Sequence, residues 1–196
     1  IQLLIKSMVV FPAGLQKPAG NLFWRRMVQQ RNVFYKIILI FLSLSGVAFG
    51  QQIDVRVNGS WSLTIDAGDL SSGASGDLTP IYTSAADQVE VSVDKVVYGS
   101  FWDWFISYDW RVDVSKQDIN WDSRMKLYAQ RTDGGYGLGG VSGGNAYQEI
   151  TGVDGFFFRG NGRRFGINIQ YELRGMSVAV PPDSYETTVV YTVTEL

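Results

Sequence analysis

The chain of 196 residues is 45% hydrophobic and 18% charged, and it contains no Cys and no His. This composition is typical of a globular protein, and the length is that of one ordinary domain. Without Cys and His the chain lacks the side chains for disulfides, thiolate nucleophiles and His-based triads, and for zinc or haem sites that use these ligands. Carboxylate chemistry, oxygen-ligand metal sites and binding or structural roles remain.

Charge is unevenly distributed along the chain. Residues 1–50 contain six Lys and Arg and no Asp or Glu, so residues 51–196 hold eleven bases, nineteen acids and a formal charge of −8. A negative charge of this size opposes attraction to nucleic acid and to anionic membrane surfaces. We therefore expect no nucleic-acid partner.

Residues 31–50 have the pattern of a secretory signal peptide. Arg31 and Lys36 precede an apolar stretch of about 13 residues, shorter than the roughly 20 that a membrane-spanning helix needs. Ala48 and Gly50 place small residues three and one positions before a cleavage site at Gln51. The pattern predicts a secreted, periplasmic or cell-surface protein with no membrane span in the mature chain. A retained anchor or an internal core helix is the alternative.

These signals divide the chain into an upstream extension with its signal peptide, residues 1–50, and a single secreted domain, residues 51–196. Because residue 1 is Ile and Met27 precedes the signal, a further expectation is that residues 1–26 lie upstream of the true start. The fold prediction is accordingly made for residues 51–196 alone, which are enough for one substantial core without disulfides.

Apolar and polar residues alternate along the predicted secreted domain. The alternation predicts strands near residues 53–57, 89–93, 104–114, 125–129, 165–173 and 185–194. Turn-forming residues lie between them, and Asn58-Gly59 is suited to a two-residue hairpin that returns the chain onto residues 61–65. The pattern predicts an all-β fold of about eight antiparallel strands, in a sandwich or small barrel.

Residues 133–144 are rich in glycine, and we expect them to form one mobile loop. No Lys-Ser or Lys-Thr pair follows the glycines and no helical pattern adjoins them, which argues against a phosphate-binding role. Arg159, Arg163 and Arg164 form a predicted basic hairpin tip nearby. These arginines are expected to pair with neighbouring acids, and an anion or partner contact is the alternative.

Aromatic and acidic residues cluster between positions 101 and 121. Trp102, Asp103 and Trp121 adjoin loop-like residues and form a candidate ligand site, because sugar faces stack on exposed rings while carboxylates accept hydrogen bonds from hydroxyls. The competing interpretation is core packing. We expect core packing for Trp104 and Trp110, which share the parity of the predicted buried face.

The acids mark out no catalytic pair, since nearly all of the nineteen alternate with apolar residues or occupy turns. Asp66, Asp69 and Asp77 lie among Gly and Ser and offer oxygen ligands for calcium, but they do not have EF-hand spacing. We therefore assign no catalytic residue, no cofactor and no metal, and we expect a protein that is not an enzyme.

The last predicted strand has the sequence PDSYETTVVYTV over residues 182–193. This segment resembles the final strand of secreted fimbrial-subunit-like proteins of the spore coat protein U kind, in which a Pro or Gly and then a Tyr precede alternating Thr and Val. A signal peptide, a mature chain of about 150 residues and loops rich in Gly and Ser agree with that group. The resemblance implies an immunoglobulin-like, pilin-related sandwich. The Cys pair common in such subunits is absent, which leaves the route of assembly open.

We predict an exported, non-enzymatic structural or surface-interaction protein, of the pilin-like or coat-subunit kind, that associates with itself or with other surface proteins. The alternative is a secreted carbohydrate-binding module whose partner is a polysaccharide. Ile53, Val55 and Val57 have the alternation of a segment that fills a neighbouring subunit's groove. Because Asn58-Gly59 follows at once, pairing within the chain is favoured over exchange between subunits.

Overall fold

The computed structural model describes residues 1–10, 52–70, 77–96 and 108–196. These residues form twelve strands and one short 3-10 turn, η1 (Ala67–Asp69). None of the described segments is an apolar helix of membrane-spanning length. The strands are β1 (Gln2–Val10), β2 (Gln52–Asn58), β3 (Ser60–Thr64), β4 (Ile81–Thr83), β5 (Val89–Val96), β6 (Asp109–Asn120), β7 (Lys126–Arg131), β8 (Val141–Gly143), β9 (Gln148–Glu149), β10 (Gly155–Asn161), β11 (Arg164–Arg174) and β12 (Ser184–Glu195).

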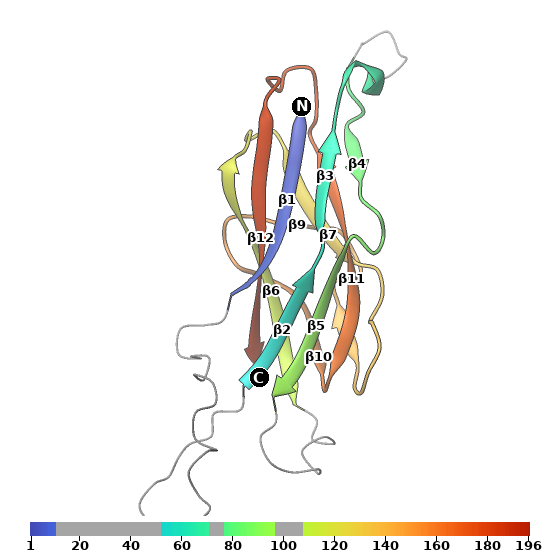
Figure 1. Cartoon of the computed structure of the whole chain (residues 1–196), viewed down its shortest axis with the longest axis vertical. Helices are drawn as coiled ribbons and strands as arrows, with labels where there is room; N and C mark the ends of the chain where they lie inside the picture. The colour runs from blue at the N-terminus through green and yellow to red at the C-terminus, as the bar shows by residue number, and fades with distance from the viewer. Residues whose placement is uncertain (11–51, 71–76, 97–107) are drawn as a thin grey trace, which may run out of the picture. The chain divides into compact units, whose positions relative to one another are not determined.

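The strands form two sheets (Figure 1). The first sheet has the order β3-β1-β12-β6-β10-β8, and the second has the order β2-β5-β11-β7-β9, with β4 also paired to β11. Among the described strands, the pairing of β1 with β12 is parallel and the other pairings are antiparallel. The prediction of an all-β sandwich is confirmed. The expected number of about eight strands is too low, since the described residues after position 51 alone form eleven, of which β4, β8 and β9 are only two or three residues long.

The core lies between the two sheets and follows the predicted alternation. Inward residues of β6 and β11, among them Trp110 and Tyr171, are fully buried and belong to one hydrophobic cluster. The indole Nε1 of Trp110 donates a hydrogen bond to the carbonyl oxygen of Gly162 at 2.8 Å, so the buried N–H is satisfied. The core prediction for Trp110 is confirmed, whereas Trp104 lies outside the described residues.

The predicted hairpin at Asn58-Gly59 is not formed. Strand β2 pairs with β5 in the second sheet, while β3 pairs with β1 in the first, so the chain crosses between sheets at Gly59. Gly59 has φ 110°, and a Cβ there would lie 2.3 Å from the carbonyl oxygen of Gln88. Gly59 thus permits a close approach of the backbone to Gln88 where the chain crosses between the sheets. Strand β2 pairs with β5 over seven residues, which is a longer ladder than the five-residue β3 could offer.

The three residues considered for strand exchange all belong to β2. Ile53 and Val55 are each 6% exposed in this chain's own core, and Val57 is partly buried against it. All three pair with residues of β5. The segment is therefore paired within the chain, but with β5 instead of the expected residues 61–65.

The glycine-rich segment 133–144 is held against β11 by Arg164 and does not project as a free loop. The guanidinium of Arg164 donates hydrogen bonds to four backbone carbonyls, with donor–acceptor distances of 2.7 to 3.1 Å. The acceptors belong to Gly134, Gly135, Gly137 and Gly139. An arginine carries five N–H donors, so this one side chain organises most of the segment.

The other two arginines of the predicted basic tip also have partners. Arg163 forms an ion pair with Asp94 at 2.9 Å, as expected for an arginine at a strand end in an acidic protein. Arg159 donates to the hydroxyl of Ser142 at 3.4 Å on the exposed surface.

Candidate functional site

Strand β1 comes from the part of the chain that the sequence analysis placed outside the fold, and it lies inside the first sheet (Figure 1). Its nine residues pair in parallel with β12, from Gln2 opposite Ser184 to Val10 opposite Thr192. On its other side, residues 2–6 pair in antiparallel fashion with β3. The sandwich therefore contains Gln2–Val10 as well as strands from residues 52–196.

Alternate side chains of β1 complete the hydrophobic core. Leu3 is 1% exposed and Ile5 is 0% exposed. Leu3 lies opposite Tyr185 of β12, and Ile5 lies opposite Trp61 of β3. The physical reason for the position of β1 is this period-two pattern, which fits a sheet with one buried face.

Polar contacts of β1 reach both the core and the surface. The hydroxyl of Ser7 lies 2.9 Å from the hydroxyl of Tyr171 in the opposite sheet. Lys6 forms an ion pair with Glu186 at the exposed surface, where such pairs contribute little to stability. Main-chain pairing and apolar burial therefore hold the strand in place.

The place of β1 defines a slot between β3 and β12. Burial of one Leu or Ile side chain stabilises a fold by about 1.5–3 kcal/mol, a large part of a typical net stability of about 5–15 kcal/mol. Without β1, strand β3 has no other partner among the described strands, and β12 presents an unpaired edge. The slot is the candidate functional site, because in this structure an extended segment with alternating buried side chains fills it.

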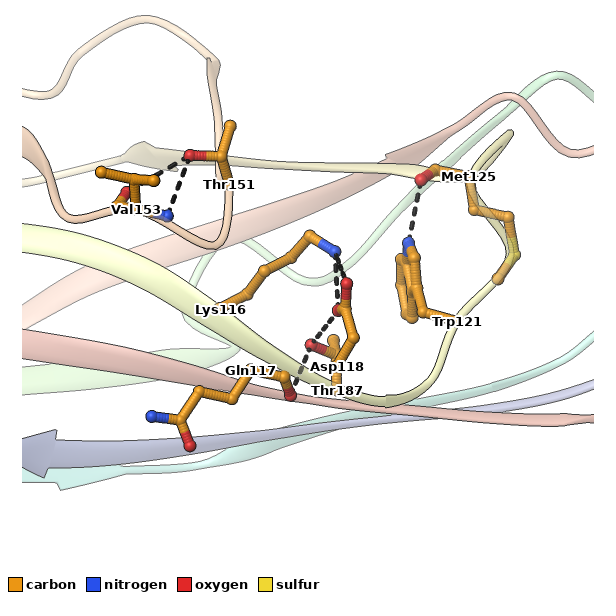
Figure 2. Close-up of polar contacts among 8 residues, drawn as sticks. All are labelled: Lys116, Gln117, Asp118, Trp121, Met125, Thr151, Val153 and Thr187. Atoms are coloured by element: carbon orange, nitrogen blue, oxygen red, sulfur yellow. Dashed lines mark hydrogen bonds and ion pairs between the residues drawn. The ribbon is translucent and has the colours of Figure 1, made fainter.

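The expected aromatic ligand site is only partly described, since Trp102 and Asp103 lie outside the described residues. Trp121 is half-buried, and its Nε1 donates a hydrogen bond to the carbonyl oxygen of Met125 at 2.9 Å (Figure 2). The ammonium of Lys116 lies 4.8 Å from the centroid of the indole ring and also pairs with Asp118. Trp121 therefore fastens the turn between β6 and β7, and Lys116 occupies one of its faces.

The acids considered for calcium serve as backbone caps. Asp66 accepts a hydrogen bond from the backbone N–H of Gly68, and Asp69 accepts one from the backbone N–H of Asp66, which together form a capping box on η1. Asp77 accepts hydrogen bonds from the backbone N–H groups of Leu78 and Val178. Within the described ranges, no group of three or more acids is arranged to hold a metal ion.

No protein-family model matches the chain, and no curated protein or solved structure gives a significant match. The class that the fold defines is the all-β sandwich of two sheets.

Proposed function

We propose that this protein is an exported, non-enzymatic structural subunit with an immunoglobulin-like sandwich, which assembles by accepting an extended strand from another protein. The observation that supports this proposal is the slot between β3 and β12, which a strand with alternating apolar residues fills. In strand addition, main-chain hydrogen bonds give affinity and alternate side chains enter pockets.

The predicted cleavage site explains why the slot would need a strand from elsewhere. Strand β1 is joined to β2 through residues 11–51, and these contain the predicted signal peptide, outside the described residues. Cleavage between Gly50 and Gln51 removes β1 from the exported chain. The exported sandwich then keeps strands β2 to β12 and has an open slot beside β12.

The contacts of β1 define the chemistry of the donor segment. A donor needs apolar side chains at the positions of Leu3 and Ile5 and a small side chain at the position of Ser7. A neighbour's β2 supplies the two apolar positions with Ile53 and Val55, but it would place Val57 at the position of Ser7 and would first have to leave its ladder with β5. We therefore propose a donor outside the paired strands, carried by a second subunit or by another surface protein.

The test uses the exported form recovered after expression of the full chain. Its intact mass gives the cleavage position, and sedimentation gives its assembly state. A synthetic peptide of residues 1–10 is then added, and the melting temperature is measured. We expect cleavage before Gln51, self-association or aggregation without peptide, and a clear rise in melting temperature with peptide.

Two matched peptides provide the control. Leu3→Lys with Ile5→Lys places charges on the inward face and should abolish the effect, whereas Leu4→Lys with Met8→Lys alters the outward face and should preserve it. A stable monomer whose melting temperature is unchanged by all three peptides would contradict the proposal. An exported form that retains β1 would contradict it as well.

A further inference from the structure

The outer face of the second sheet carries a hollow of about 730 Å³ over strands β2, β5 and β11. This volume lies within the range of pockets that hold small ligands. Its lining combines an aromatic ring, Tyr136, with outward-facing polar side chains of the three strands. The hollow lies on the sheet opposite the β1 slot, so it is independent of the proposed assembly site.

Tyr136 is exposed and yet fixed in position. Its side chain is 71% exposed, while its backbone exchanges two hydrogen bonds with Phe165, at 2.9 and 2.8 Å. The two ring centroids lie 5.7 Å apart, and a Cβ on Gly166 would lie 3.4 Å from the Tyr136 ring. The Tyr136 ring therefore lies in ordinary contact with β11. Its backbone bonds and its ring contact with Phe165 position the aromatic surface before any ligand arrives, which lowers the cost of binding.

Asp133 presents a fixed carboxylate at the same hollow. One oxygen accepts hydrogen bonds from the backbone N–H groups of Gly135 and Asn168, at 2.9 and 3.0 Å. The other accepts a hydrogen bond from the side-chain amide of Asn168 at 2.7 Å. A carboxylate has about four acceptor positions, so one remains for a ligand hydroxyl or ammonium group.

The charge of the hollow selects among ligands. Its lining has four carboxylates, Asp54, Glu90, Asp94 and Asp133. Arg56 pairs with Asp54 at 2.8 Å and Arg163 pairs with Asp94 at 2.9 Å, so the excess negative charge is that of Glu90 and Asp133. In the part of the chain that the structure describes, no Lys or Arg forms an ion pair with Glu90. The excess negative charge repels anionic ligands and favours cationic ones.

We propose that this hollow binds a saccharide that carries free amino groups. A sugar face stacks on Tyr136, a hydroxyl donates to Asp133, and an ammonium group lies against Glu90. An uncharged sugar can also stack on Tyr136 and donate a hydroxyl hydrogen bond to Asp133. It binds more weakly because it has no ammonium group to be attracted by the carboxylates. Saccharides with carboxylate or sulfate groups are rejected.

The test measures binding of three oligosaccharides by calorimetry to the full chain produced without export, in which β1 fills the slot. The probes are a glucosamine tetramer, its N-acetylated form and a galacturonate tetramer, at about pH 5, where the amino groups of glucosamine are largely protonated. We expect the affinity order glucosamine, N-acetylglucosamine, galacturonate, with the first weakened by added salt. No binding of the first two probes, or the reverse order, would overturn the proposal.

Variants locate the binding surface. Tyr136→Ala should lower the affinity for the glucosamine tetramer about tenfold. Tyr136→Phe, which keeps the ring, should retain most of the affinity. Glu90→Gln should lower the affinity for the glucosamine tetramer more than the affinity for its N-acetylated form. Leu138→Ala is the matched control, since Leu138 is 51% exposed in the same segment and does not line the hollow. Equal binding by Tyr136→Ala and the control would show that the site lies elsewhere and refute the assignment.

Discussion

The hydroxyl groups of Tyr171 and Tyr191 lie 2.8 Å apart and join the two sheets of the sandwich. Both side chains are fully buried, and Ser7 of β1 extends the hydrogen-bonded chain. Burial raises the pKa of Tyr171 to about 12, although its hydrogen bonds to Ser7 and Tyr191 act in the opposite direction. Burial also raises the pKa of Tyr191 well above its usual value.

The raised tyrosine pKa values predict loss of stability at alkaline pH. An unfolded tyrosine titrates near pH 10, so above that pH the unfolded state binds fewer protons than the folded state. Protonated, buried Tyr171 stabilises the folded state fully below pH 10. As the pH rises through about 12, the free energy of unfolding should fall by roughly 3 kcal/mol for Tyr171 alone. Urea unfolding of the full chain between pH 8 and pH 12 measures the loss.

The double variant Tyr171→Phe, Tyr191→Phe tests the assignment of this pH dependence. It should lose less stability between pH 10 and pH 12 than the natural chain does. An identical slope in both proteins would assign the alkaline transition to other groups.

Loss of an inward side chain of β1 should destabilise the uncleaved protein. Ile5→Ala removes a fully buried side chain, and we expect a decrease of roughly 2–5 kcal/mol in the free energy of unfolding. Chemical unfolding of full chain produced without export provides the measurement. Lys6→Ala, on the outward face, should change stability by no more than about 0.5 kcal/mol. Equal effects of the two substitutions would argue against a strand packed in the slot.

Removal of the Arg164 side chain should loosen the glycine-rich segment. Arg164→Ala leaves four carbonyls without their guanidinium donor, and we expect a loss of roughly 1–3 kcal/mol. Hydrogen exchange should accelerate over residues 133–144, and saccharide binding through Tyr136 should weaken. Arg159→Ala is the control, because Arg159 contacts only the Ser142 hydroxyl in the described hydrogen bonds. Unchanged exchange in Arg164→Ala would contradict this role.

Substitution of Trp121 should affect stability but not saccharide binding. Trp121→Ala removes the hydrogen bond to Met125 and the contact with Lys116, and a loss of roughly 1–3 kcal/mol is expected. Ile119→Ala, at a position 68% exposed, should be nearly neutral. A loss of glucosamine binding in folded Trp121→Ala would instead restore the ligand site expected from the sequence.

The strands with one buried face were predictable from the sequence. In β11, apolar side chains recur at every second residue from Phe165 to Leu173, and β12 follows the same alternation except at Thr187 and Val190. A half-buried strand is the structure that suits this spacing. The crossing at Gly59 was not predictable in the same way. Asn58-Gly59 is a favourable local hairpin sequence, and the distant strand β5 supplied a ladder that outweighed the local preference.

The slot and the hollow were missed for a different reason. Leu3 and Ile5 show the alternation of a strand, but they precede a basic export signal, and such a signal predicts that the residues before it lie outside the mature fold. Tyr136 and Glu90 are far apart in the sequence and line one hollow because the glycine-rich segment is held against β11, which pairs with β5. No local pattern carries that information.

The pairing of Gln2 with Ser184 bears on the order in which the molecule folds. Closing this ladder brings together segments separated by nearly the whole chain, and contacts of such long range form slowly because loop closure must precede them. The hairpins and long ladders of β5 to β12 can form earlier, so a sandwich with its last place still empty is the expected intermediate. The lifetime of this intermediate would set the time during which another extended segment could bind beside β12 in place of β1.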